Sequence, residues 1–239
     1  ASDLAYAANK FDRGFEHLVY VWGPDHDGYV PRLKAAIDAL GRGTCELIIY
    51  PQVRFLENGQ PLGLSKRRGS ILSVRDRVNE IGRDATRFCF LMRTVDAHLD
   101  FDLDLARAQS QDNPVYYVQY AHARICSILR EGVERGIIRE NDGDADLSLL
   151  TDPDELALMR RIAEYPHELL TAAEYRAPHR LTFFARDLAQ SFHQFYGTCR
   201  VLDPDAPAMS QARLKLVHAT QTVLRNCLGI LGISAPERM

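Results

Sequence analysis

The sequence predicts an α/β region followed by an all-α region. Two short apolar runs, residues 17–22 and 46–50, flank a helical stretch, which is typical of a strand–helix–strand unit in a parallel sheet. From residue 113 onward, apolar residues recur at helical spacing and prolines mark where segments begin. With 239 residues, 46% hydrophobic and 26% charged, the chain has the composition of an ordinary globular protein of one or two domains.

The first elements are predicted in the order strand, helix, strand. The strand at 17–22 ends at Gly23, a helix opened by proline covers 31–40, and the second strand covers 46–50. In parallel sheets, ligands bind beyond the carboxyl ends of the strands. We therefore expect the segment 23–28 to border a ligand crevice.

A hairpin and a basic loop follow. The dipeptide Asn-Gly at 58–59 is a strong hairpin signal. The segment 62–70 then places Lys66, Arg67 and Arg68 between glycines and serines. Such a loop can cover a polyphosphate and neutralise charge on a leaving pyrophosphate. A solvated basic loop or a kinase substrate site fits the same residues, and the loop alone favours these plainer interpretations.

The rest of the chain is predicted to be mainly helical. Helices are expected over 73–82, 84–93, 113–135, 153–165, from Pro166 onward, 178–196 and 207–229. Asn113 is a good N-cap before Pro114, Asp152 caps the next helix, and Pro166 is expected to end one helix and open another. Five helices with short connections after residue 113 make a helical bundle.

The stretch 96–106 alternates aspartates with apolar residues. Phe101, Leu103 and Leu105 are expected to form an apolar face beneath a solvated acidic one. Four aspartates close together also raise the possibility of a metal site. The alternation favours the solvated face, and we predict no metal site in the protein.

Three tyrosines lie on the predicted helix that begins after Asn113. Tyr117 and Tyr120 are three residues apart and Tyr116 and Tyr120 four apart, so each pair shares a helix face. With Arg124 they form a surface that can stack unpaired bases. Tyrosines half-buried in a core fit the same spacing, and chemistry alone favours that interpretation.

Composition narrows the class of protein. No apolar run reaches the length of a membrane span, and no signal-peptide pattern is found at the N-terminus. The five cysteines are far apart, which indicates reduced thiols in a cytoplasmic protein rather than a zinc site. A net charge of −3 does not by itself indicate a nucleic-acid binder, although a protein that binds structured RNA can gather its cations locally.

The segment 113–124, N-P-V-Y-Y-V-Q-Y-A-H-A-R, resembles the opening helix of the anticodon-binding domain of arginyl-tRNA synthetases. Other segments resemble the same family: S-D-L-A-Y at 2–6 with Lys10, G-P-D-H at 23–26, F-D-L-D-L-A at 101–106, 178–182, 192–196 and the closing S-A-P-E-R-M at 234–239.

The basic loop resembles the K-M-S-K-S signature of class I aminoacyl-tRNA synthetases, in the M-S-K-R variant of the arginyl enzymes. Ser65, Lys66 and Arg67 match the variant, whereas Leu64 stands in place of Met and Gly63 in place of the first Lys. The resemblance implies that Lys66 stabilises the pyrophosphate in the transition state, with Ser65 and Arg67 also in a catalytic role.

By position, the resemblance implies three groups of binding residues: Gly23, Asp25, His26 and Leu64 for ATP; Asp3 and Asp25 for arginine; and Tyr117, Tyr120, Arg124 and Met239 for tRNA. Asp3 would pair with the guanidinium of arginine, which requires a buried carboxylate. An N-cap of the first helix is the alternative role for Asp3. Arg180 and Tyr196 are weaker candidates for RNA contact.

The fold class implied is the C-terminal half of a Rossmann-like class I catalytic domain (1–108) followed by a helical-bundle anticodon-binding domain (109–239). The other class I signature, H-I-G-H, does not occur in the sequence, so we expect the chain to be a C-terminal portion that is inactive alone. Half of a sheet would also expose an apolar face, which favours self-association.

The resemblance implies an arginine–tRNA ligase, which converts ATP, L-arginine and tRNA(Arg) to arginyl-tRNA(Arg), AMP and pyrophosphate. ATP would bring Mg²⁺ with it, and the partners would be tRNA(Arg) and L-arginine, without DNA or a membrane. A non-catalytic tRNA-binding or interaction module derived from that family is the alternative. A different class I synthetase with a similar bundle is a third possibility, which the matching segments at both ends disfavour.

Overall fold

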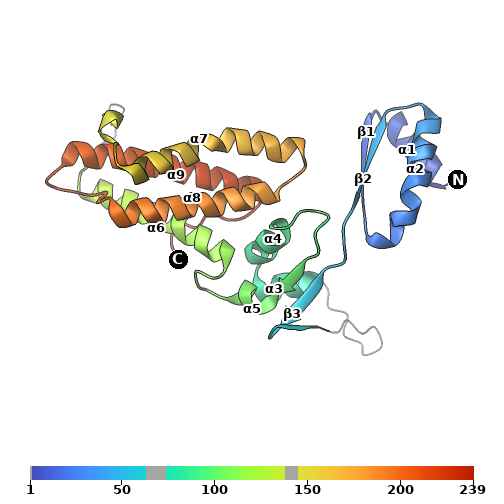
Figure 1. The fold of residues 1–239 in the computed structure, drawn as a ribbon, viewed down its shortest axis with the longest axis horizontal. Coiled ribbons are helices and arrows are strands. Elements are labelled where there is room, and N and C mark those ends of the chain that lie inside the picture. The colour runs from blue at the N-terminus through green and yellow to red at the C-terminus, as the bar shows by residue number, and fades with distance from the viewer. Residues whose placement is uncertain (1, 63–73, 138–144) are drawn as a thin grey trace. The chain divides into compact units, whose positions relative to one another are not determined.

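The computed structural model describes residues 2–62, 74–137 and 145–239, and it divides into two compact units (Figure 1). Unit 1 comprises 1–55 and 93–101, and unit 2 comprises 56–92 and 102–239. The division of the sequence into domains at 108/109 stays a prediction. Within the described ranges, no helix is long and apolar enough to cross a membrane.

Unit 1 contains the predicted strand–helix–strand arrangement. Its elements are α1 (Ser2–Asp12), β1 (His17–Trp22), the 3-10 helix η1 (Pro24–Tyr29), α2 (Val30–Leu40) and β2 (Thr44–Ile49). Strands β1 and β2 are parallel, in a register that runs from His17 opposite Thr44 to Trp22 opposite Ile49. The parallel crossover predicted from the two apolar runs is therefore confirmed.

The core of unit 1 is small. Its buried members are Ala7, Phe11, Leu18, Leu33 and Ile37. Side chains alternate between the two faces of a strand, and in β1 this alternation buries Leu18 but leaves Val19 and Val21 exposed by 45% and 59%. One face of the two-stranded sheet is thus packed on helices, and the other presents apolar side chains, as predicted; self-association through it stays a prediction.

The predicted hairpin is also present. Strands β3 (Arg54–Glu57) and β4 (Gln60–Pro61) pair antiparallel around Asn58 and Gly59, whose φ angles are 50° and 70°. Positive φ at both central residues is what a tight two-residue hairpin requires. With β5 (Asp100–Asp102), these strands form a sheet of order β4-β3-β5.

Three short helices belong to unit 2: α3 (Val74–Ile81), α4 (Arg83–Leu91) and α5 (Leu103–Arg107). The predicted alternation fails within α5. Asp102 Oδ1 accepts the backbone N–H groups of Asp104 and Leu105 at 2.9 and 3.0 Å, which starts a helix at Leu103. A helix has a period of 3.6 rather than 2, so Leu103 is buried whereas Leu105 is 39% exposed.

The long helices of unit 2 lie side by side around one core (Figure 1). They are α6 (Pro114–Glu134), α7 (Pro153–Glu174), α8 (His179–Thr198) and α9 (Pro207–Leu231), with the short 3-10 helix η3 (Leu147–Leu149) before α7. Helix α8 packs against α6, α7 and α9. The helical bundle predicted for this region is confirmed.

One prediction within the bundle is wrong. Pro166 neither ends nor opens a helix, because α7 continues through it from Pro153 to Glu174. An internal proline removes one backbone hydrogen bond and costs about 3 kcal/mol. Packing of α7 before Pro166 offsets this cost: Leu158 is fully buried, and the Tyr165 ring lies 5.4 Å from that of Phe184 on α8.

The caps predicted for α6 and α7 are both present. Asn113 is buried, and its Oδ1 accepts the N–H of Val115 at 3.2 Å. Asp152 Oδ1 accepts the N–H of Asp154 at 2.9 Å, and Glu155 Oε2 accepts the N–H of Asp152 at 2.9 Å. These bonds satisfy N–H groups that a helix terminus leaves without partners, which fixes where both helices begin.

Candidate functional site

The main candidate site is a cluster of aromatic rings where α6 meets α8. The rings of Tyr116 and Tyr120 lie 6.5 Å apart and are tilted by only 8°. His193 of α8 lies 6.0 Å from Tyr120 at 27° and 5.1 Å from Tyr117 at 55°. We call these four residues with Tyr196 the aromatic cluster. It brings together residues more than 70 positions apart in the sequence.

Arg124 adds a positive charge to the aromatic cluster. Its guanidinium lies 4.8 Å from the centre of the Tyr196 ring, and Nη1 donates to the Tyr120 hydroxyl at 3.3 Å. Arg124 is exposed, so donors of the guanidinium remain open to solvent. A planar fork held on an aromatic face suits contact with a phosphate or a base.

The tyrosines are only partly buried. Tyr117 packs against the bundle core, and burial raises its pKa above the ordinary value. Tyr116 and Tyr120 are also half-buried. Each of these tyrosines is therefore in part a core residue and in part a surface residue, because its side chain is partly packed on the protein and partly open to solvent.

His193 was not singled out from the sequence. Burial lowers its pKa and the neighbouring charge of Arg124 lowers it further, so the ring is neutral at pH 7. A neutral imidazole offers one donor and one acceptor nitrogen. His193 and Tyr196 are three positions apart, which places both on one face of α8; this spacing is the signal that the sequence offers.

Arg180 is a poor candidate for RNA contact. Its Nε and Nη2 donate to the two carboxylate oxygens of Glu168 at 3.0 and 2.9 Å. This bidentate pair joins α8 to α7 and occupies the donors that a phosphate would need.

Three of the candidates in unit 1 lie just beyond the carboxyl end of β1. Gly23 follows the strand directly, and Asp25 and His26 are exposed on η1. The His26 ring packs on Trp22 at 5.3 Å. Asp3 lies in the first turn of α1 and is exposed, so this chain does not by itself enclose it as a buried carboxylate.

The predicted catalytic loop lies outside the described residues, and with it Leu64, Ser65, Lys66 and Arg67. Among the residues that the structure does describe, no three His, Cys, Asp or Glu side chains are grouped so that they could hold a metal ion.

A model of the DALR anticodon binding domain matches residues 118–239, which is half of the chain. The matched range contains Tyr120, Arg124, His193 and Met239. The chain belongs to the DALR anticodon-binding domain family. Tyr116 and Tyr117 lie just before the matched range of the DALR domain.

Similar proteins extend the likeness over the whole chain. The arginine–tRNA ligase of Moorella thermoacetica is 52% identical over 100% of this chain and 43% of its own length. That of Bacillus subtilis is 48% identical over 99% of this chain and 43% of its own length. The chain thus spans less than half the length of these curated relatives.

Solved structures agree with this likeness. A protein of Campylobacter jejuni assigned as an arginyl-tRNA synthetase has a TM-score of 0.84 at 29% identity and is matched over 99% of this chain and 51% of its own. The arginyl-tRNA synthetase of Thermus thermophilus has a TM-score of 0.69 at 25% identity, over 94% of this chain and 41% of its own.

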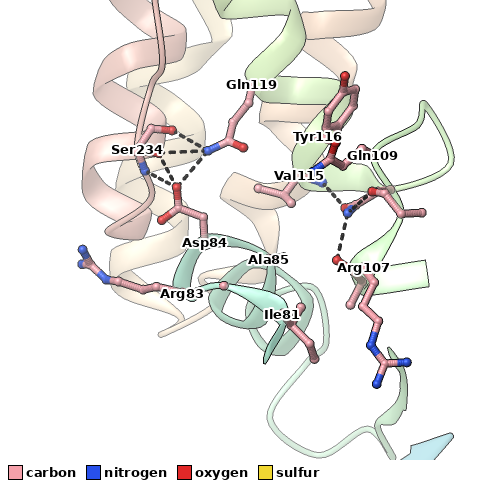
Figure 2. A pocket seen from close by; sticks show the side chains of 14 residues that line it. Ile81, Arg83, Asp84, Ala85, Arg107, Gln109, Val115, Tyr116, Gln119 and Ser234 are labelled. Atoms are coloured by element: carbon pink, nitrogen blue, oxygen red, sulfur yellow. Dashed lines mark hydrogen bonds between the residues drawn. The ribbon is translucent and has the colours of Figure 1, made fainter. Parts of the chain in front are cut away.

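In unit 2, a cleft of about 470 Å³ lies beside the aromatic cluster, lined by Tyr116 and Gln119 of α6 and by residues of α4 (Figure 2). Two of its polar side chains are engaged within the protein: Gln119 contacts Asp84 and Ser234, and Arg107 pairs with Glu57 and Glu80.

The tail that follows α9 in the DALR domain runs along α6, and the C-terminus lies beside that helix (Figure 1). His122 and Arg130 of α6 donate to carbonyl oxygens of the tail. Met239 at its end is 54% exposed. These contacts hold the tail beside α6.

Proposed function

We propose that unit 2 binds the anticodon loop of tRNA(Arg), and that the chain is the C-terminal part of an arginine–tRNA ligase. The observation that carries the proposal is the aromatic cluster with Arg124 beside it, on the surface of a DALR domain. In this proposal Tyr117 and Tyr120 stack on anticodon bases, Arg124 meets a phosphate or base, and Met239 contacts a base from the tail.

Physical chemistry supports these roles. Sequence-specific RNA recognition targets unpaired bases in loops, which aromatic rings and guanidinium planes can stack upon. The half-buried tyrosines are held in place by the bundle, so little side-chain entropy remains to be lost on binding. The net charge of −3 requires the cations to act locally, as Arg124 does at the aromatic cluster.

A binding experiment tests this part of the proposal. Stacking on an aromatic side chain contributes about 1–3 kcal/mol per base, so Tyr120→Ala should weaken the binding of a tRNA(Arg) transcript by roughly 5- to 150-fold. Tyr175→Ala is the matched control, because Tyr175 is 75% exposed at the end of α7 and outside the aromatic cluster. Equal affinity of the wild type and Tyr120→Ala would refute the stacking role.

The proposal extends to catalysis in the complete ligase. There the carboxylate of arginine attacks the α-phosphate of ATP, giving arginyl-adenylate and pyrophosphate; a ribose hydroxyl of the terminal adenosine of tRNA then takes the arginyl group and releases AMP. The protein positions the reactants and stabilises charge. Mg²⁺ would arrive with the ATP phosphates.

The residues proposed for the catalytic half fall into three groups, and Asp25 belongs to two of them. The proposed roles are Asp3 and Asp25 for binding arginine, Gly23, Asp25, His26 and Leu64 for bordering ATP, and Lys66 with Ser65 and Arg67 for acting on the pyrophosphate. The exposure of Asp25 and His26 beyond the carboxyl end of β1 supports their part, since ligands of parallel sheets bind there. The free thiols of all five cysteines support a cytoplasmic location.

Lys66→Ala in the complete ligase tests the catalytic part. Arginylation should fall sharply while the affinity for arginine changes little, because Lys66 is proposed to act on the pyrophosphate rather than on the amino acid. An unchanged rate would remove Lys66 from the mechanism. If the complete polypeptide bound tRNA(Arg) but never formed arginyl-adenylate, the protein would be a non-catalytic tRNA-binding module instead.

A further inference from the structure

The tail after α9 is fixed by a three-way junction between α4, α6 and the tail itself. The backbone N–H of Ser234 donates to Asp84 Oδ2 at 3.1 Å, and the Ser234 hydroxyl donates to the same oxygen. Gln119 Nε2 lies 2.9 Å from Asp84 Oδ2, 3.0 Å from the carbonyl oxygen of Ser234 and 3.1 Å from its hydroxyl (Figure 2). One carboxylate oxygen of α4 thus gathers donors from the tail and from the helix that carries the tyrosines.

Helix α4 also fixes the point where the tail begins. Arg87 Nε donates to the carbonyl oxygen of Leu231, the last residue of α9. Gly232 follows with a φ of 69°, and a Cβ there would lie 2.7 Å from Arg87 Nε. Asp84 and Arg87 are three residues apart and share one face of α4. This face therefore contacts both the end of α9 and the start of the tail.

Beyond Ser234, side chains of α6 continue to hold the tail. His122 Nδ1 donates to the carbonyl oxygen of Pro236 at 2.9 Å, and Arg130 Nη1 donates to that of Glu237 at 3.3 Å. None of residues 234–239 is buried. Ile233 is buried in the core and Ala235 packs against it, and beyond these two residues polar bonds hold the tail that ends at Met239.

The face of α6 that holds the tail is next to the face that carries the tyrosines. At about 100° per residue, Gln119, His122 and Arg130 fall on one stripe, and Tyr120 and Arg124 fall on another, roughly a third of a turn away. A tail held on the first stripe can thus present its end beside the second.

We propose that Asp84, Gln119 and Ser234 are positioning residues for anticodon recognition: they set the place of Met239 and thereby the selectivity for the anticodon without touching RNA. The inference rests on the proposed function. It adds that selectivity depends on α4, which packs on α6 and α9 but precedes the residues that the DALR model matches, because Asp84 supplies the oxygen that holds the junction together.

A double-mutant cycle tests the inference in the full chain. Dissociation constants are measured for a tRNA(Arg) transcript and for a transcript with replaced anticodon bases, using the wild type, Asp84→Ala, Met239→Ala and the double variant. Selectivity is the dissociation constant of the altered transcript divided by that of the tRNA(Arg) transcript. This ratio should fall about fivefold or more in each single variant. The double variant should be no worse than either one, because Asp84 acts through the tail that Met239 ends.

Controls separate positioning from folding. Asp112→Ala is the matched control, since Asp112 is exposed and its only bonds among the described residues are to Ser110. Ser234→Ala removes one hydroxyl from an exposed position and should lower the ratio while the thermal unfolding midpoint stays that of the wild type. It keeps the test decisive if Asp84→Ala also loosens the bundle.

The outcomes are distinguishable. If the wild type shows no preference for its own anticodon, the proposed function itself falls. If the preference exists and requires Tyr120 but is unchanged in Asp84→Ala and Ser234→Ala, only the positioning role is overturned. Effects of Asp84→Ala and Met239→Ala that multiply in the double variant would likewise overturn it, because the two residues would then act independently.

Discussion

Gly43 of unit 1 is a position where a single methyl group should have a large effect. Its φ is 68°, and a Cβ would lie 2.3 Å from the backbone oxygen of Glu16 and 2.6 Å from the Phe11 ring. The left-handed conformation costs a non-glycine residue about 1–2 kcal/mol, and overpacking adds about 1–3 kcal/mol. Gly43→Ala should therefore destabilise unit 1 by about 2–5 kcal/mol.

Gly41→Ala separates the two contributions. Gly41 has a similar φ of 62°, but no heavy atom lies within 4 Å of its Cβ position. Only the conformational cost applies there, so the loss should be about 1–2 kcal/mol. A unit of roughly 60 residues is expected to have only about 3–9 kcal/mol of stability, so the two variants should differ visibly.

The assay uses the single tryptophan of the chain. Trp22 lies in β1 and packs against the core of unit 1, so its fluorescence during urea unfolding reports on that unit. The far-ultraviolet circular dichroism signal comes mainly from the long helices of unit 2, and its urea midpoint should be the same in both variants as in the wild type. Equal fluorescence midpoints for Gly43→Ala and Gly41→Ala would refute the predicted clash with Glu16 and Phe11.

Three further predictions concern unit 2. Glu155→Ala should lower the free energy of unfolding of unit 2 by about 3–5 kcal/mol, measured by circular dichroism in urea. The buried Glu155 carboxylate accepts a hydrogen bond from Arg213 Nε at 2.7 Å, and its loss leaves the largely buried charge of Arg213 unpaired. Burial and the charge of Arg124 lower the pKa of His193, so on acidification the unfolded chain binds a proton at this histidine before the folded chain does. The free energy of unfolding should therefore fall as the pH drops below about 6.5, and His193→Gln should reduce this fall. Burial raises the pKa of Cys227 to about 12, so a thiol reagent at pH 8 should modify it only after unfolding.

Elements set by local chemistry could be predicted from the sequence. The caps Asn113 and Asp152 act within two or three residues, and both begin the helices that they were expected to begin. The hairpin at 58–59 likewise follows from its dipeptide. The prediction that a helix ends at Pro166 is wrong because packing of α7 on α8 opposes the local preference of proline. The residues next to Pro166 in the sequence carry no information about that packing.

The candidate site was predictable only in part. Tyr117 and Tyr120 could be named because their spacing lies within one helix. His193 could not, because it reaches the tyrosines from another helix. The bond between Asp84 and Ser234 joins residues 150 positions apart and depends on how α4, α6 and α9 pack, so the spacing of residues in the sequence gives no sign of it.

The most direct test of the central claim is a nuclease footprint of the chain on a tRNA(Arg) transcript. The proposal predicts protection of the anticodon loop by the wild-type chain and by Tyr175→Ala, and its loss with Tyr120→Ala. Protection confined to other parts of the tRNA, or an anticodon loop that stays protected in Tyr120→Ala, would contradict the proposal that the aromatic cluster binds the anticodon.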